Sequence, residues 1–371
     1  MPETAIGFLA TRTWAGLRVL IQGRSYLAKS RYRGSSVLFS LTPRRGFNYL
    51  LNNIERRLKR VRLISRPYIY LIDVNNYCNL GCPLCLSGGL MEQEQVKGIK
   101  RGYMRPEQLE KALEQVGPYA TNLLLYNWGE PFIHPNIEEL LAIVHRHGLS
   151  TVLSTNFNVF TESMAESVIR SQLHRIIVSI DGVDQETYEK YRAGGKFQTV
   201  VDNIKLLVRK KKERGAAFPL INAQFIVMRH NQDRLEEFEK MFLEMGVDSV
   251  SFRPMSLMSQ NGGAEARSLV ASRPDYKPYY ELDRKEFCDD LYNTFVVNYN
   301  GDAYTCCIVS LDKHLSYGNL FKDGLANIWN NDAYLYSRSI FARKDAPENA
   351  HKVMCNVCKG TQKNEELSQL F

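Results

Sequence analysis

The chain has 371 residues, 44% hydrophobic and 24% charged, and this balance excludes a wholly disordered protein. No apolar run reaches the roughly 18 residues of a membrane-spanning helix, and the opening residues do not resemble a secretory signal, so we expect a cytoplasmic protein. The net charge of +8 is concentrated at the N-terminus, where residues 1–66 carry a net +12 and the rest of the chain carries −4.

The basic segment at 1–66 contains a predicted amphipathic helix. Apolar side chains recur there at helical spacing, with Lys and Arg at most positions between them: Phe47, Leu50, Leu51, Ile54, Leu58 and Val61. Such a helix can lie on an anionic surface, and the apolar stretch from Trp14 to Ile21 favours peripheral contact with the inner membrane. The interpretation we favour is that the stripe packs under the folded core. A nucleic-acid partner is not expected, because the body is slightly acidic and no RNA module is visible.

The first cysteine group follows an apolar segment at 69–74, which predicts a strand. Cys78, Cys82 and Cys85 come directly after it in a loop that contains glycine and proline. Three thiolates on one loop can hold three irons of a 4Fe–4S cluster and leave the fourth iron open to an exchangeable ligand. The alternative is a zinc knuckle, but zinc needs a fourth nearby Cys or His, and the loop has none.

Strand-like and helix-like segments alternate along the middle of the chain, which predicts βα units around a parallel sheet. The predicted strands are 69–74, 122–127, 150–154, 175–180, 220–228 and 249–253. The predicted helices are 105–116, 136–147, 161–171, 197–213 and 231–245. We expect residues 86–103 to form a loop over the first cysteines, and residues 256–287 to form a linker or substrate-side loop.

Polar residues and turn formers follow the predicted strands at their carboxyl ends, where barrels of this kind place their chemistry. They are Tyr126, Gly129, Glu130, Pro131, Ser154, Asn156, Ser179, Asp181, Arg229 and Arg253. Taken singly, each polar side chain is more typical of a cap or a turn than of a ligand. For Glu130, the alternative to a ligand role is an ordinary acid near the N-terminus of the helix at 136–147, where the helix dipole favours a negative charge.

Four later cysteines have the spacing of a second ligand set: Cys288, Cys306, Cys355 and Cys358. Apolar segments flank Asn300-Gly301, which favours a hairpin with a type I′ turn that brings Cys288 near Cys306. The four thiolates suit an iron–sulfur cluster or, alternatively, a zinc ribbon. Cys307 is left over. We favour an inert thiol, and the alternatives are exchange of the ligand role with Cys306 or hydrogen-atom donation to a substrate.

The cysteine loop and the Gly129-Glu130-Pro131 segment resemble the radical S-adenosylmethionine (SAM) enzymes, whose signature is C-x3-C-x2-C after the first strand of an open (β/α)6 partial barrel. Those enzymes usually have an aromatic residue where this chain has Leu84. The second cysteine group resembles their SPASM/Twitch extension, a small hairpin and helix unit, and the one-cluster Twitch form fits better because no cysteine follows Cys358. The resemblance implies a barrel at 67–255 and an auxiliary domain at 288–371, which leaves the basic, partly amphipathic arm at 1–66 ahead of the barrel and the linker at 256–287 between the two.

The resemblance also implies SAM and two 4Fe–4S clusters as cofactors. Cys78, Cys82 and Cys85 would hold the SAM-binding cluster, and Glu130 would accept the amino group of SAM. The residues that would line the SAM and substrate site are Leu84, Gly129, Pro131, Ser154, Asn156, Ser179, Asp181 and Arg229. One electron from a flavodoxin- or ferredoxin-type protein would cleave SAM to a 5′-deoxyadenosyl radical, which removes a hydrogen atom from the substrate.

The reaction we expect is oxidation or epimerisation of a sugar-like or aminocyclitol-like alcohol. In the oxidation, the auxiliary cluster would accept the electron of the substrate radical. Cys307, Arg253 and Tyr126 are unranked catalytic candidates. A peptide-modifying enzyme is the alternative, since that branch shares the extension. A non-catalytic iron–sulfur or zinc carrier or scaffold is a further alternative, although a carrier needs no SAM pocket.

Overall fold

The computed structural model describes residues 40–88, 100–255, 264–276, 287–307, 313–342 and 353–356. Several predictions lie outside these ranges: those for Trp14 to Ile21, for most of the loop at 86–103, for parts of the linker at 256–287 and for Cys358. Among the helices within them, none is long and apolar enough to cross a membrane.

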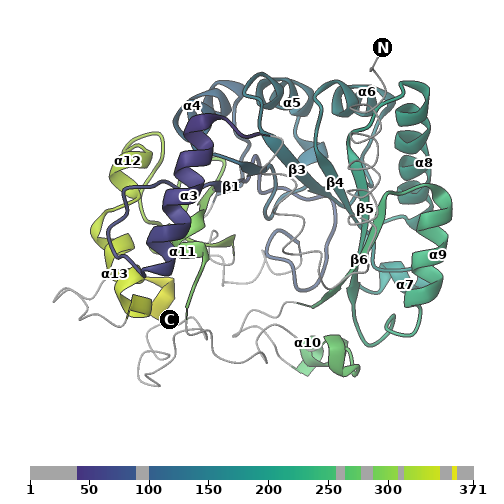
Figure 1. Ribbon diagram of the computed structural model, residues 1–371. Helices are drawn as coiled ribbons and strands as arrows, with labels where there is room; N and C mark the ends of the chain where they lie inside the picture. The colour runs from purple at the N-terminus through teal and green to yellow at the C-terminus, as the bar shows by residue number, and fades with distance from the viewer. Residues whose placement is uncertain are drawn as a thin grey trace, which may run out of the picture.

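Six parallel strands form most of one sheet, with neighbours in the order β6-β5-β4-β3-β2-β1. Their bounds are β1 Ile69–Ile72, β2 Asn122–Leu124, β3 Ser150–Thr155, β4 Arg175–Ser179, β5 Leu220–Val227 and β6 Ser249–Pro254. The connecting helices are α4 Pro106–Val116, α5 Ile137–Arg146, α6 Glu162–Arg170, α8 Phe197–Glu213 and α9 Leu235–Met245, and they follow one another around the outside of the sheet (Figure 1). The predicted open (β/α)6 partial barrel is confirmed.

The hairpin of the C-terminal extension belongs to the same sheet. β7, Thr294–Val297, pairs in parallel with β1, and β8, Ala303–Tyr304, pairs antiparallel with β7. The hairpin was predicted, but its type I′ turn was wrong: the Gly301 amide donates to Asn298 O (2.8 Å), and of Asn300 and Gly301 only the glycine has a positive φ (+90°). A type I′ turn needs two such residues, and the five-residue connection here needs one.

The auxiliary unit shares a hydrophobic core with the barrel. Its elements are α11 Asp290–Asn293, η5 Lys313–Leu315, α12 Leu325–Ile328, α13 Asp332–Ala342 and η6 Met354–Asn356. Trp329 is fully buried and its Nε1 donates to Ser65 O (2.9 Å), ahead of β1. The buried Arg338 guanidinium lies 4.3 Å from the Trp329 ring centroid and donates to Leu291 O (3.0 Å). Within the linker, α10 Ala264–Leu269 and η2 Pro274–Tyr276 are ordered, and Val270 bridges to Met228 after β5.

The N-terminal helix α3, Pro43–Arg57, packs in the opposite sense from the favoured prediction. Its buried side chains are polar: Arg45, Asn48, Asn52 and Glu55. Its apolar stripe faces outward, with Phe47 69% exposed and Leu50 63% exposed. The physical reason is that the polar side chains hydrogen-bond main-chain groups at the amino end of the sheet, as Arg45 does with Gly117 O (2.9 Å). In Figure 1, α3 lies beside α11 and α13, at the β1 end of the barrel.

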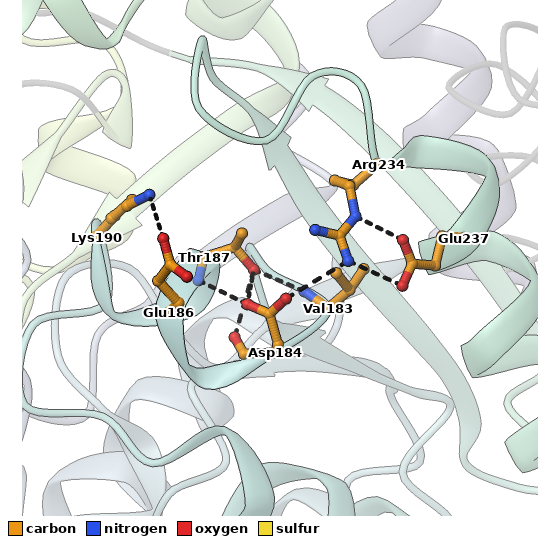
Figure 2. Close-up of polar contacts among 7 residues, drawn as sticks. All are labelled: Val183, Asp184, Glu186, Thr187, Lys190, Arg234 and Glu237. Atoms are coloured by element: carbon orange, nitrogen blue, oxygen red, sulfur yellow. Dashed lines mark hydrogen bonds and ion pairs between the residues drawn. The ribbon is translucent and has the colours of Figure 1, made fainter.

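The loop after β4 is fixed by a capping arrangement that the sequence analysis did not identify. Asp184 caps α7, Gln185–Glu189, where its Oδ1 accepts from the Thr187 amide (2.8 Å) and the Thr187 hydroxyl (2.7 Å). Arg234, at the start of α9, bridges Asp184 to Glu237 (Figure 2). These contacts tie the β4 loop to the following βα unit.

We predict that Asp184→Ala destabilises the protein by about 1 kcal/mol, the usual cost of a lost cap. The amide and hydroxyl of Thr187, followed by Arg234, hold the pKa of Asp184 below its usual value. A depressed folded-state pKa adds stability that is complete above the unfolded pKa and is lost as pH falls through the folded one, so the difference will shrink below about pH 4. Urea midpoints measured by circular dichroism test this. Glu186→Ala is the control, because exposed Glu186 makes only a one-turn pair with Lys190 and will change stability by less than about 0.5 kcal/mol.

Candidate active site

The cysteine loop lies at the carboxyl end of β1, in apolar surroundings. Cys78, Cys82 and Cys85 pack with apolar side chains that come from several strand ends: Leu80, Leu84, Tyr191, Met228 and Met255. Burial, with the neighbouring thiols and Glu130 adding to it, raises the pKa of Cys78 to about 12, and burial also raises that of Cys82. Within the described residues, no three Cys, His, Asp or Glu side chains converge on one metal ion. Because cluster cysteines each bind a different iron, this arrangement suits a cluster better than a zinc knuckle.

The Gly129-Glu130-Pro131 segment is fastened to the chain just before Cys78. The Glu130 amide donates to Tyr77 O (2.7 Å), and Asn75 Nδ2 donates to Glu130 O (3.1 Å). Gly129 is required by this contact, because a Cβ there would lie 1.9 Å from Asn75 O. The segment is therefore held against the chain directly ahead of the cysteine loop.

Glu130 holds the ends of β2 and β3 together. Its side chain is 3% exposed and caps the short η1 helix, Pro131–Ile133, by accepting from the Phe132 amide (3.1 Å). It also accepts from the Thr155 hydroxyl (2.7 Å) and the Asn156 amide (2.6 Å). Burial raises its pKa to about 6, although these three donors oppose the shift. A carboxylate has about four acceptor positions, so Glu130 can cap η1 and still accept one further donor.

Asp73 was missed by the sequence analysis. It ends the first strand, and its buried Oδ2 accepts from the Trp128 amide (3.1 Å). Burial raises its pKa to about 7, opposed by the amides of Trp128, Gly129 and Asn127. The sequence feature that could have identified Asp73 is a lone carboxylate at the end of an otherwise apolar strand. The Asp73 carboxylate holds the turn formed by Asn127, Trp128 and Gly129.

The predicted polar residues of β3 and β4 lie close together. Ser154 Oγ and Ser179 Oγ are 3.4 Å apart, on adjacent strand ends. Asn156 Nδ2 reaches Cys78 Sγ (3.7 Å) and Asn79 Oδ1 (2.9 Å), so it contacts the cysteine loop directly. Arg229 differs from this group, since it is exposed and donates to Val270 O (3.3 Å) after β5.

A buried ion pair lies beside Cys82. Asp181 is 0% exposed and accepts from Arg192 Nε (2.6 Å) and from the Ile226 amide (2.7 Å). Arg192 also hydrogen-bonds Cys82, which opposes the rise in the pKa of that thiol. The pKa of Arg192 is well above its usual value despite its burial, because Asp181 and the thiol stabilise its charge. Arg192 was missed, since no periodicity links it to the strand ends.

We predict that Arg192→Met lowers stability by roughly 3–5 kcal/mol, because it leaves the Asp181 carboxylate buried without its counter-ion. Urea unfolding of the metal-free protein measures this effect separately from cluster loading. Arg209→Met is the matched control, since Arg209 is 61% exposed and pairs with Glu213 at the surface (3.6 Å). A loss for Arg192→Met no greater than that for Arg209→Met contradicts the assignment.

The three catalytic candidates lie on three segments, with Tyr126 after β2, Arg253 on β6 and Cys307 after β8. The pKa of Tyr126 is raised to about 12, chiefly by burial and then by Cys307, while Arg253 on β6 opposes the rise. The loop after β2 also contacts the auxiliary unit, since Cys307 O accepts from Trp128 Nε1 (3.1 Å). Cys307 is exposed, and burial of its sulfur still raises the pKa of the thiol to about 11.

Three of the four predicted auxiliary ligands lie in the described residues. Cys288 and Cys355 each pack on the shared core, and burial, followed by Asp290 and Cys355, raises the pKa of Cys288 to about 12. Burial, followed by Cys355 and Cys306, raises the pKa of Tyr334, and Tyr317 Oη lies 3.9 Å from Cys355 Sγ. Cys358 lies outside the described residues.

Two family models match the chain. The model of the radical SAM superfamily matches residues 72–245, which hold the cysteine loop and four complete strands of the six, β2 to β5. The chain belongs to the radical SAM superfamily. The model of the SPASM domain, an iron–sulfur cluster-binding domain, matches residues 288–359, which contain all four predicted auxiliary ligands.

Curated radical SAM relatives are similar over much of the chain. The tungsten-containing aldehyde ferredoxin oxidoreductase cofactor-modifying protein of Pyrococcus furiosus is 24% identical over 310 residues, 74% of this chain and 83% of that protein. The AdoMet-dependent heme synthase of Methanosarcina barkeri is 25% identical over 232 residues, and the chain spans only 61% of its length.

Solved structures share the fold. Streptococcus suis SuiB bound to S-adenosylmethionine superposes with a TM-score of 0.59 at 17% identity, covering 85% of this chain and 79% of that one. The structure of anSMEcpe with AdoMet and the Cp18Cys peptide gives a TM-score of 0.55 at 17% identity, covering 79% and 88%.

Membership implies SAM, a 4Fe–4S cluster and auxiliary iron–sulfur binding as the cofactors of this protein. The side chains present fit these groups. The cysteine loop offers three thiols in apolar surroundings, and Glu130 keeps one acceptor position beside that loop. The absence of a Cβ at Gly129 lets Asn75 O pack against the segment and so holds Glu130 next to the chain that leads into the loop.

Proposed function

We propose that this radical SAM enzyme oxidises a polar substrate and passes one electron of the substrate radical to the auxiliary cluster. Cys78, Cys82 and Cys85 would hold the cluster that binds SAM, and the bound pair would supply the removal of a hydrogen atom from carbon. Among the residues of this chain, Glu130 holds the amino group of SAM, and Ser154, Ser179 and Asn156 line the same end of the barrel. A flavodoxin- or ferredoxin-type protein supplies the first electron.

One contact carries the oxidation proposal: Trp128 Nε1 to Cys307 O, at 3.1 Å. Trp128 directly precedes Gly129 in the predicted SAM-binding segment, and Cys307 directly follows the predicted auxiliary ligand Cys306. The hydrogen bond therefore supports a short separation between the substrate site and the auxiliary cluster, which favours an electron acceptor over a remote structural cluster.

The substrate is a sugar-like or aminocyclitol-like alcohol in the first form of the proposal. Its support is the pair of hydroxyls at adjacent strand ends, Ser154 Oγ and Ser179 Oγ at 3.4 Å, which suits a small hydroxylated molecule. A peptide substrate is the second candidate. Its support is the likeness in fold to SuiB bound to precursor peptide SuiA, with a TM-score of 0.57, and to peptide-bound anSMEcpe.

In the test, anaerobically reconstituted and reduced protein is incubated with SAM and with each of two panels of candidate substrates. One panel contains polyols and aminocyclitols, and the other contains peptides. Oxidation gives a product two hydrogens lighter than the substrate, in water or in D2O, whereas epimerisation leaves the mass unchanged in water and adds one carbon-bound deuterium in D2O. Cys288→Ala/Cys355→Ala, in the auxiliary set, should still cleave SAM but lose the oxidised product. Formation of that product at the wild-type rate overturns the acceptor role, and the panel that reacts decides the substrate class.

A further inference from the structure

The outward face of α3, together with Leu41 ahead of it and the turn that follows it, forms an apolar patch, here called the α3 surface. Eight large hydrophobic side chains are exposed in the described residues, and only Tyr103 and Leu243 lie elsewhere. The other six belong to this surface: Leu41, Phe47, Leu50, Ile54, Leu58 and Ile64. A contiguous patch of this kind marks an interaction site, whereas scattered apolar residues do not.

The orientation of α3 is fixed by its polar face. Arg45 donates to Gly117 O (2.9 Å) and to Gly148 O (3.0 Å), and Asn52 Nδ2 donates to Tyr292 O (2.6 Å). Similar contacts link Asn48 to Arg66 (3.0 Å) and Glu55 to the amides of Ile64 (2.7 Å) and Ser65 (3.0 Å). Rotation that buried the apolar stripe would break these bonds and leave buried polar groups without partners, so the stripe stays outward.

The charges around the α3 surface select an anionic partner. Within residues 40–66 the single carboxylate is Glu55, which is 2% exposed, whereas Arg57, Arg60 and Arg62 are exposed. Residues 1–39 carry six basic residues against one acid, so the sequence ahead of α3 adds to the positive charge of this part of the chain. A second copy would bring the same positive charge. A partner that is both anionic and able to take up apolar side chains fits best.

We propose that the α3 surface docks on an anionic lipid bilayer. An amphipathic helix with an apolar face and a basic rim lies in the plane of such an interface, and its basic residues are attracted to acidic head groups. The bonds of α3 go to residues just ahead of the strands, such as Gly148 before β3 and Tyr292 before β7, whereas the cysteine loop follows the carboxyl end of β1. The bilayer therefore lies at the amino end of the barrel, and the active site opens on the opposite side, toward soluble substrates and the reductant.

The test is co-sedimentation of the full-length protein with phosphatidylcholine vesicles, with and without phosphatidylglycerol. We expect binding to the anionic vesicles that weakens with salt. Phe47→Ser/Leu50→Ser/Ile54→Ser should lower the apparent affinity roughly tenfold or more, and so should Arg57→Glu/Arg60→Glu/Arg62→Glu. Leu243→Ser, at an exposed leucine on α9, is the matched control and should bind like the wild type.

Circular dichroism and unchanged iron content establish that each variant is folded, which is expected because the substituted side chains are exposed. The proposal is overturned if the wild type does not bind anionic vesicles, or if the triple serine variant binds as tightly as the wild type. It is also overturned if the wild type is a dimer by light scattering that the serine variant converts to a monomer, since a second copy is then the partner.

Discussion

Cys78→Ala/Cys82→Ala/Cys85→Ala will halve the iron and acid-labile sulfide of the anaerobically reconstituted protein, from about eight to about four atoms of each per chain. The three thiols share one loop after β1, and the described residues around them offer no replacement set of ligands. The second ligand set lies on other elements, where Cys288 and Cys355 pack on the core shared with the barrel. Loss of one cluster should therefore leave the other intact.

Cys307→Ala is the matched control for this experiment, because it removes a thiol that directly follows the predicted ligand Cys306. It should keep about eight irons. A fall to about six or fewer identifies Cys307 as a ligand and overturns its interpretation as an inert thiol. If the wild type holds about four irons and the triple variant none, the auxiliary site carries no cluster and the electron-acceptor role fails.

Gly129→Ala should weaken SAM binding by more than about tenfold, which is a loss of at least about 1.4 kcal/mol. A Cβ at this position would lie 1.9 Å from Asn75 O and 2.5 Å from Asn75 Oδ1. Asn75 lies after β1 and three residues ahead of Cys78, so a shift of Asn75 also shifts the chain that leads into the cysteine loop. The substitution must therefore shift Glu130 or Cys78, or both. Equilibrium dialysis of the reconstituted protein against labelled SAM measures the effect.

Gly81→Ala is the matched control, since Gly81 lies inside the cysteine loop and a Cβ there would meet Ala193 O at 3.9 Å, an ordinary contact. It should bind SAM within about twofold of the wild type, since nothing must move to admit the methyl group. Gly129→Ala with unchanged affinity would show that this segment does not form the SAM site. Equal losses in the two variants would indicate a general sensitivity of the loop.

The parts of the fold set by local pattern were predictable from the sequence. Each parallel strand carries a short apolar run followed by a polar turn, and the carboxyl ends of parallel strands meet at one edge. This is why Ser154 and Ser179, 25 residues apart, were expected at one site and lie 3.4 Å apart. The pairing of β7 with β1 was not predictable, because it joins residues more than 200 positions apart with no local signal.

The orientation of α3 shows where periodicity misleads. An apolar stripe normally faces the core, because burying it removes apolar surface from water. In α3 the buried side is set instead by Arg45, Asn48 and Asn52, whose main-chain partners lie on distant segments and cannot be inferred from spacing. Arg192 was missed for a related reason, since its function comes from Asp181 and Cys82 in space.

The most direct test of whether this chain is a radical SAM enzyme is whether the reconstituted, chemically reduced protein forms 5′-deoxyadenosine from SAM. Liquid chromatography with mass spectrometry measures the product. A radical SAM enzyme built on the cysteine loop should produce 5′-deoxyadenosine and methionine in equal amounts. The Cys78→Ala/Cys82→Ala/Cys85→Ala variant should produce neither. If wild-type protein with its first cluster loaded and reduced leaves SAM intact, both alone and with either substrate panel, the account is contradicted and an iron–sulfur carrier or scaffold takes its place.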